Sequence, residues 1–141
     1  MRKLLFLNIL LCYLCVTANC SKDDFTCVAG NFTTGRPVNV TCYFGPDVHN
    51  KMYHFEIVRY PFNAPSSQSG EDVLRCHRLG NELRCTTRKG FVFNENIQDN
   101  LTISIPQVTV DQAGRYACQL IPPDDRKKRL CDLNVKEIEV A

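Results

Sequence analysis

Apolar and polar residues alternate along short segments of the chain, and this period of two predicts β-strands rather than helices. In the segment PVNVTCYF (37–44), the residues expected to share the inner face are Val38, Val40, Cys42 and Phe44. In KMYHFEIVRY (51–60), the alternation predicts Tyr53, Phe55 and Ile57 inward and His54, Glu56 and Val58 outward.

Further strands are predicted at regular intervals along the rest of the chain. The segment 72–87 divides into two strands around Gly80-Asn81, a pair of residues typical of tight turns. Other strands are expected at residues 89–95, 100–105, 114–120 and 131–140, while proline, glycine and serine make residues 60–72 a loop. Many short strands at this spacing indicate an all-β sandwich.

The first twenty residues have the layout of a secretory signal peptide. Arg2 and Lys3 precede an apolar run from Leu4 to Val16, which is followed by small residues. The run is shorter than the roughly 20 residues that span a bilayer, and no later segment is longer, so no membrane insertion is expected. We therefore expect a signal peptide at residues 1–20 and one extracellular domain at residues 21–141.

Cysteine usage agrees with secretion. Of nine cysteines, Cys12 and Cys15 leave with the signal peptide. Cleavage after Cys20 leaves six, which implies a disulfide framework in a small secreted domain. Cleavage after Ala18 instead keeps Cys20 as a seventh cysteine, which would favour an intermolecular bridge and a homodimer.

Three classes of function find no support in the composition. Lys and Arg number 17 against 15 Asp and Glu, and loss of Arg2 and Lys3 leaves 15 against 15, so nucleic-acid binding is not expected. The cysteines after the signal are not spaced as zinc ligands, and His49, His54 and His77 form no metal-binding pair, so no metal or other cofactor is expected. The adjacent carboxylates Asp23-Asp24 and Asp124-Asp125 point apart on an extended chain, which argues against an enzyme.

The segment QVTVDQAGRYACQL (107–120) contains the most specific pattern. Tyr116 lies two residues before Cys118, on the same face of one predicted strand, and Gly114 begins that strand. This spacing is typical of a tyrosine corner, in which the phenol bonds to the backbone upstream. A catalytic Tyr116 would need a base nearby in sequence, and there is none. Cys118 then points into the core, where it can meet Cys42 on the facing sheet.

The segments VNVTCYF and LTISIPQVTVDQAGRYACQL resemble strands B, E and F of an immunoglobulin V-type domain. The resemblance covers residues 21–141 and implies an immunoglobulin-like V-type β-sandwich stabilised by disulfides. The chain lacks the tryptophan usual on strand C, so Phe55 is expected to fill that place. Gln112 stands where the family has an acidic residue and Asp111 is one residue early, which puts in doubt the usual ion pair with an arginine such as Arg88.

The other four cysteines are similar in arrangement to those of immunoglobulin-like ectodomains of molluscs and other lophotrochozoan invertebrates, some of them immune-type proteins. Those domains carry a cysteine before strand B, a pair before strand D and one on strand G. Six cysteines allow fifteen connectivities. The resemblance implies Cys76–Cys85, which could face each other across a hairpin, and Cys27–Cys131, alongside Cys42–Cys118.

Two further sets of residues are candidates for modification or binding. The sequons at Asn31, Asn39 and Asn100 predict N-glycans. The segment IPPDDRKKRL (121–130) joins the last two strands, where variable domains carry a hypervariable loop, and its candidate contact residues are Asp124, Asp125, Arg126, Lys127, Lys128 and Arg129. Three alternatives for this segment are a solvated hairpin tip, a processing site after RKKR, and contact with sulfated glycans.

A second candidate surface is the sheet face formed by residues 52–60 and 73–86. Basic side chains are expected on it, with Tyr60 and Phe62 at its edge: Arg75, His77, Arg78 and Arg84. The alternative is that these are ordinary solvated positions.

The expected function is recognition of a protein or glycan ligand, in immune recognition or cell adhesion. The end of the chain directly after the last predicted strand favours a receptor ectodomain. The signal peptide without a membrane segment favours a complete soluble protein. A third alternative is a disulfide-rich secreted effector such as an inhibitor or decoy.

Overall fold

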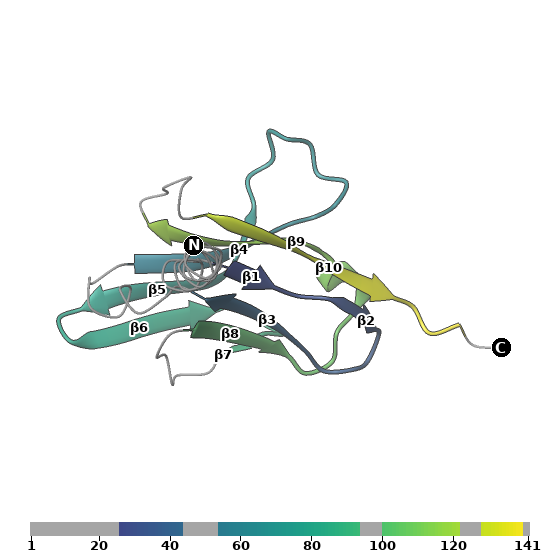
Figure 1. Cartoon of the computed structure of the whole chain (residues 1–141), viewed down its shortest axis with the longest axis horizontal. Coiled ribbons are helices and arrows are strands. Elements are labelled where there is room, and N and C mark those ends of the chain that lie inside the picture. Colours follow the sequence, from purple (N-terminus) through teal and green to yellow (C-terminus); the bar gives the residue numbers. More distant parts are fainter. Residues whose placement is uncertain (1–25, 44–53, 94–99, 122–127, 140–141) are drawn as a thin grey trace, which may run out of the picture.

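The chain folds into two β-sheets. The computed structural model describes residues 26–43, 54–93, 100–121 and 128–139 (Figure 1). One sheet has four strands in the order β1-β3-β8-β7, and the other has six in the order β2-β10-β9-β4-β5-β6. The strands are β1 (Thr26–Val28), β2 (Asn31–Thr33), β3 (Val38–Tyr43), β4 (His54–Tyr60), β5 (Glu71–Leu79), β6 (Glu82–Thr87), β7 (Val92–Phe93), β8 (Asn100–Ile105), β9 (Gly114–Ile121) and β10 (Arg129–Lys136).

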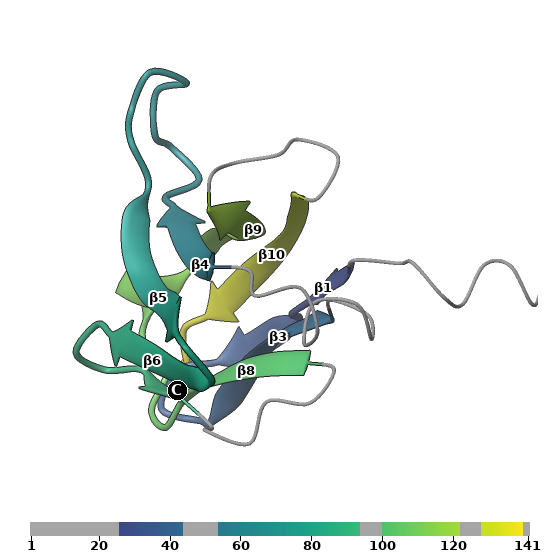
Figure 2. The same ribbon diagram turned by 90° about the vertical axis from the view of Figure 1, so that its left-hand side faces the viewer.

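The core lies between the two sheets and follows the predicted alternation. In β3, Val38, Val40 and Cys42 are buried while the residues between them are half-buried or exposed. In β8 the buried residues are Leu101, Ile103 and Ile105. The six-stranded sheet curls strongly, and β6 lies beside the layer that holds β8 (Figure 2). Phe55 is buried in the same cluster, so the core position predicted for it is confirmed.

The alternation predicted for β4 is only half correct. Phe55 and Ile57 face the core as predicted, but Glu56 and Val58, expected to be outward and solvated, are also buried. The flanking strands β5 and β9 place Arg75 and Gln119 beside Glu56 on that face, so neighbouring side chains cover it. Gln119 donates to the carboxylate of Glu56, and a Cβ atom at Gly70 would clash with the Val58 side chain, so the chain at Gly70 covers that side chain.

The first two strands belong to different sheets. β1 pairs with β3 antiparallel, and three residues later β2 pairs with β10 in parallel. The N-terminal part of the chain therefore crosses from the four-stranded to the six-stranded sheet between Val28 and Asn31.

Three disulfides hold the domain together, and they are the pairs that the resemblance implies. Cys42–Cys118 and Cys27–Cys131 each join the two sheets. Cys76–Cys85 joins opposite residues of the β5–β6 hairpin, whose turn contains Gly80 at φ 63°. Such a set of bonds indicates an oxidising environment.

Several expectations fall on residues outside the described ranges. These are the signal peptide and Cys20, the inward side chains of Phe44 and Tyr53, and the carboxylate pair Asp23-Asp24. The strand predicted for residues 89–95 is Val92–Phe93 in the described part, and the last strand ends at Lys136. Among the described residues, no helix has the length and apolar character needed to cross a membrane.

Candidate functional site

A tyrosine corner fixes the start of β9. The hydroxyl of Tyr116 donates a hydrogen bond to the carbonyl oxygen of Gln112, 2.7 Å away, at the end of a short 3-10 helix, η1 (Val110–Gln112). The Gln112 side chain in turn accepts from the backbone N–H of Thr109. Burial raises the pKa of the Tyr116 hydroxyl, so it remains a protonated donor at neutral pH. This geometry gives Tyr116 a structural role.

Gly114 allows the same corner to approach β4. Its φ is 155°, and a Cβ atom there would lie 2.6 Å from the carbonyl oxygen of Tyr60. A side chain would therefore clash with backbone that cannot move easily. The start of β9 can lie against the end of β4 only because this residue is glycine.

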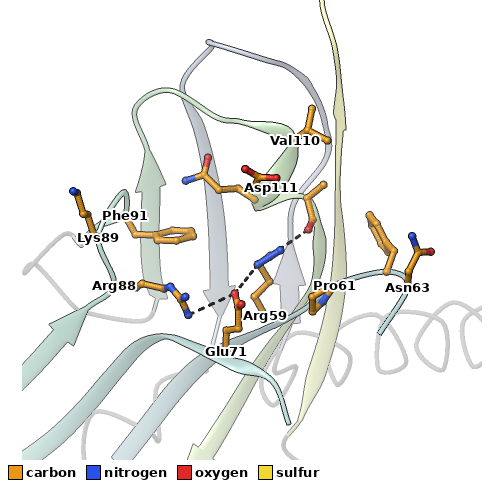
Figure 3. Close-up of a pocket in the computed structure, with 12 residues that line it drawn as sticks. Arg59, Pro61, Asn63, Glu71, Arg88, Lys89, Phe91, Val110 and Asp111 are labelled. Atoms are coloured by element: carbon orange, nitrogen blue, oxygen red, sulfur yellow. Dashed lines mark hydrogen bonds and ion pairs between the residues drawn. The ribbon is translucent and has the colours of Figure 1, made fainter. Parts of the chain in front are cut away.

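Arg59 connects the corner to the neighbouring strand. Its Nε donates to the carbonyl oxygen of Ala113 at 3.2 Å, and its Nη1 donates to the carboxylate of Glu71 at 2.6 Å (Figure 3). The Arg59 side chain is only 13% exposed, so both bonds are shielded from water. Arg88 approaches the same oxygen of Glu71 at 3.5 Å. Three segments distant in sequence thus meet at one carboxylate.

The bonds to arginine control the charge of Glu71. The hydrogen bond from Arg59 lowers the pKa of Glu71, partial burial opposes this, and the charges of Arg59 and Arg88 add to the lowering. Glu71 is therefore ionised throughout the neutral range. Its negative charge holds the two guanidinium groups together.

These groups line a recess of about 590 Å³, which we call the charged hollow. Figure 3 shows Arg88 and Phe91 on one side, Pro61 and Asn63 on the other, and Arg59 and Glu71 between them. Its lining residues are Arg59, Pro61, Phe62, Asn63, Glu71, Arg88, Lys89, Phe91, Val110, Asp111, Gln112 and Ala113. Among them are three cations and two carboxylates, so the hollow carries a net positive charge.

Arg88 forms its ion pair with a residue other than the one considered from the sequence. It pairs with Glu71 rather than with Asp111. Within the described ranges Asp111 has no salt bridge and lies exposed at the rim of the hollow.

A second recess, which we call the groove, lies on the other side of Pro61 and Phe62. It has a volume of about 290 Å³ and is lined by Tyr60, Pro61, Phe62, Ala64, Pro65, Ser66, Gln68, Arg115, Lys128 and Leu130. The Nζ atom of Lys128 lies 5.6 Å from the centre of the Tyr60 ring, within the range of a cation–π contact. Phe62 lines both recesses and is 48% exposed.

The structure describes only part of the predicted binding segment. Asp124, Asp125, Arg126 and Lys127 lie outside the described ranges. Lys128 lies at the groove, and Arg129 begins β10 with its side chain exposed. The end of this segment therefore meets the loop after β4, a relationship that the sequence alone did not indicate.

The second predicted surface is less basic than expected, and the structure does not bring its four residues together. Arg75, His77 and Arg84 share one face, whereas Arg78 lies on the opposite face of β5, where its Nε is buried. Arg75 forms salt bridges with Glu56 and Asp72, each at 3.0 Å, and Arg84 lies 3.5 Å from Glu82. His54, expected to be a surface histidine, is half-buried and accepts a hydrogen bond from the backbone N–H of Arg78. Nearby carboxylates thus offset part of the positive charge.

The sequence did not predict that the residues of the charged hollow would meet. Arg59, Glu71, Arg88 and Phe91 lie in separate segments, and no spacing pattern relates them. The only signal was the mismatch at Gln112 and Asp111, which put the expected ion pair of Arg88 in doubt.

The three predicted glycosylation sites all lie on the surface. Asn31, Asn39 and Asn100 are all exposed on strands, where glycans could be attached.

The Sγ atoms of Cys27, Cys42 and Cys118 lie within 4.8 Å of one another, and we call them the sulfur cluster. All three are in disulfide bonds, which removes the thiolates that a metal would need.

No protein-family model matches the chain, and no curated protein matches its sequence. The assignment of function therefore rests on the sequence and the geometry described above.

Proposed function

We propose that this chain is a secreted or cell-surface recognition module with an immunoglobulin-like V-type fold. The observation that carries the proposal is the strand arrangement: β1 in one sheet, β2 in the other, and β3 joined to β9 by the Cys42–Cys118 bond. This arrangement and the Tyr116 corner both agree with the V-type pattern. Immunoglobulin-like sandwiches commonly present ligand-contact loops on a rigid frame.

The contact surface that the geometry favours is centred on Phe62. This aromatic side chain is half exposed between the charged hollow and the groove, and Leu130 at the groove is 50% exposed. Large apolar side chains surrounded by polar groups are typical of protein-binding surfaces. The partner is therefore a protein, which we favour over a glycan.

Charge indicates which kind of protein segment fits. The linings of the two recesses together hold five cations (Arg59, Arg88, Lys89, Arg115 and Lys128) and two carboxylates (Glu71 and Asp111). Arg59 and Arg115 are occupied by Glu71 and by Asp132, respectively. Lys89 is exposed, Lys128 is half-buried, and Arg88 is 50% exposed although it also pairs with Glu71. The complementary segment is therefore acidic with an apolar anchor for the Phe62 region.

The test uses the secreted chain, tetramerised and fluorescently labelled, on intact cells of the tissue that produces it. We expect binding that is lost after protease treatment of the cells and survives removal of their glycans. Substitution F62A should weaken it at least about tenfold, as for a central interface residue. The matched control is L79A, because Leu79 is equally apolar and 57% exposed but lines neither recess.

Three results would contradict the proposal. Equal losses for F62A and L79A would show that the surface around Phe62 is not the contact site. Binding removed by glycosidases and retained after protease treatment would identify a glycan ligand instead. Recovery of the native protein only from body fluid, without any cell-bound fraction, would favour a soluble decoy or inhibitor.

A further inference from the structure

Two of the disulfides lie against each other in the core. Cys27 of the Cys27–Cys131 bond contributes its sulfur to the sulfur cluster, within 4.8 Å of both sulfurs of the Cys42–Cys118 bond. Cys131 does not belong to this cluster. Only the Cys27 end of the Cys27–Cys131 bond therefore faces the Cys42–Cys118 bond.

Strand pairing gives Cys27 a second possible partner. In the β1–β3 ladder Cys27 lies directly opposite Cys42. Residues directly opposite in an antiparallel pair have Cβ atoms about 4.5–5.5 Å apart, close to the spacing that a disulfide requires. A Cys27–Cys42 bond could therefore form with little movement of the two strands.

Access to the two bonds also differs. Cys27 and Cys131 are half-buried, whereas Cys42 and Cys118 are fully buried. The Cys27–Cys131 bond is therefore the more accessible of the two to an external thiol. Cys27 is the only sulfur of the accessible bond that also belongs to the cluster.

We propose that the sulfur cluster is a thiol–disulfide exchange site that responds to an external dithiol. The dithiol reduces the Cys27–Cys131 bond and is itself oxidised to a disulfide. The thiolate of Cys27 then attacks Sγ of Cys42, so that a Cys27–Cys42 bond forms and the Cys42–Cys118 bond breaks. The bonding electron pair leaves on Cys118, which takes up a proton. The second step is an isomerisation without net oxidation or reduction.

The exchange changes how the sheets are connected. Before it, two bonds join the four-stranded sheet to the six-stranded sheet. Afterwards the new bond lies within the four-stranded sheet, and no disulfide joins the sheets. Strand β10, which carries the Leu130 edge of the groove, is then held only by its neighbours. This site goes beyond the proposed recognition function and does not depend on it.

Substitution C131A tests the exchange without any reductant, because it leaves Cys27 as a free thiol beside the intact bond. The secreted full chain would be quenched in acid, deglycosylated, and digested with pepsin at low pH, where thiolates are absent. Mass spectrometry would then identify the linked peptides. We expect a Cys27–Cys42 linkage in at least about one molecule in ten. The Cys27–Cys42 and Cys42–Cys118 bonds are both ordinary disulfides, so neither pairing should exclude the other.

Substitution C27A is the matched control. It removes the same disulfide but frees Cys131, which lies outside the sulfur cluster. We expect it to keep Cys42–Cys118 intact, with at least about tenfold less exchanged product than C131A. The Cys76–Cys85 bond should remain unchanged in both variants.

Other outcomes would overturn the proposal. Full retention of Cys42–Cys118 in a folded C131A, with Cys27 free to be alkylated, would exclude the exchange. A Cys27–Cys118 linkage would show that Cys42 is not the atom attacked. If C131A does not fold, the unmodified protein is pulsed with one equivalent of dithiothreitol. Free Cys27 and Cys131 beside an intact Cys42–Cys118 bond would then reject the site.

Discussion

The hydroxyl of Tyr116 donates a hydrogen bond to the carbonyl oxygen of Gln112, four residues earlier, across a distance of 2.7 Å. The bond closes the connection between β8 and β9 at the point where the chain crosses from one sheet to the other. It also supports the wall of the charged hollow, because Gln112 and Ala113 line that recess. One buried hydroxyl thus fixes both the fold and the candidate site.

Removal of this hydroxyl should destabilise the domain. Substitution Y116F leaves a carbonyl without its donor, which costs about 1–3 kcal/mol of the free energy of unfolding. Denaturant titration would measure the loss. Y43F is the matched control, because Tyr43 is 43% exposed and its hydroxyl can bond to water. Equal stability of Y116F and Y43F would show that the corner contributes nothing.

The salt bridge of Glu71 should make stability depend on acidity. Its pKa is lower in the folded chain than in the unfolded chain, so its contribution is complete above the ordinary pKa of a glutamate. The contribution is lost as the pH falls through the lowered value. E71Q should therefore melt at a lower temperature than the wild type at pH 7, and the difference should shrink progressively as the pH falls below the ordinary pKa of a glutamate.

A control for that experiment is available on the surface. Glu82 pairs with Arg84 at 3.5 Å, but both side chains are at least 70% exposed. E82Q should leave the melting temperature unchanged at either pH, because exposed ion pairs contribute little. A constant difference between E71Q and the wild type at all pH values would contradict the assigned role of ionisation.

The disulfides should differ in their contributions to stability. Cys42–Cys118 spans 76 residues and Cys76–Cys85 spans nine. The loop-entropy relation gives about 4.5 kcal/mol for the long bond and about 2.5 kcal/mol for the short one. C42A/C118A should therefore lower the free energy of unfolding more than C76A/C85A in denaturant titrations. The opposite order would show that packing around Cys76, rather than loop closure, dominates.

Two glycines with unusual backbone angles should respond differently to alanine. At Gly114 a Cβ atom would meet the backbone of Tyr60, whereas at Gly35, with φ 79°, nothing lies within 4 Å. G35A should cost about 1 kcal/mol for the backbone angle alone. G114A should cost about 2 kcal/mol more, because two strands must separate. Thermal unfolding of both variants would measure the difference, and equal shifts would exclude the clash.

Several features of the fold could be read from local sequence. Alternation placed Val38, Val40 and Cys42 in the core because a strand's side chains point to opposite faces whatever surrounds it. Gly80-Asn81 marked a hairpin because few residues adopt its backbone angles. Tyr116, two residues from Cys118, marked a corner because both must share a face.

The same reasoning failed where more than one neighbour decides burial. Glu56 and Val58 alternate correctly for an outer face, but side chains of the flanking strands and the chain at Gly70 cover that face. Arg75 was expected to make a basic surface, yet Glu56 and Asp72 partly offset it. The period of two predicts which face of the sheet a side chain points to, whereas the burial of that side chain depends on what packs against the face.

The sequence by itself determined an all-β, disulfide-rich domain, because strand period, turn residues and cysteine count are local or additive properties. Only the tertiary structure decided which side chains meet. It brought Arg59, Glu71 and Arg88 together from three segments, and it set the sulfur of Cys27 against the Cys42–Cys118 bond. Such contacts depend on the order and curl of the sheets, which no spacing along the chain encodes.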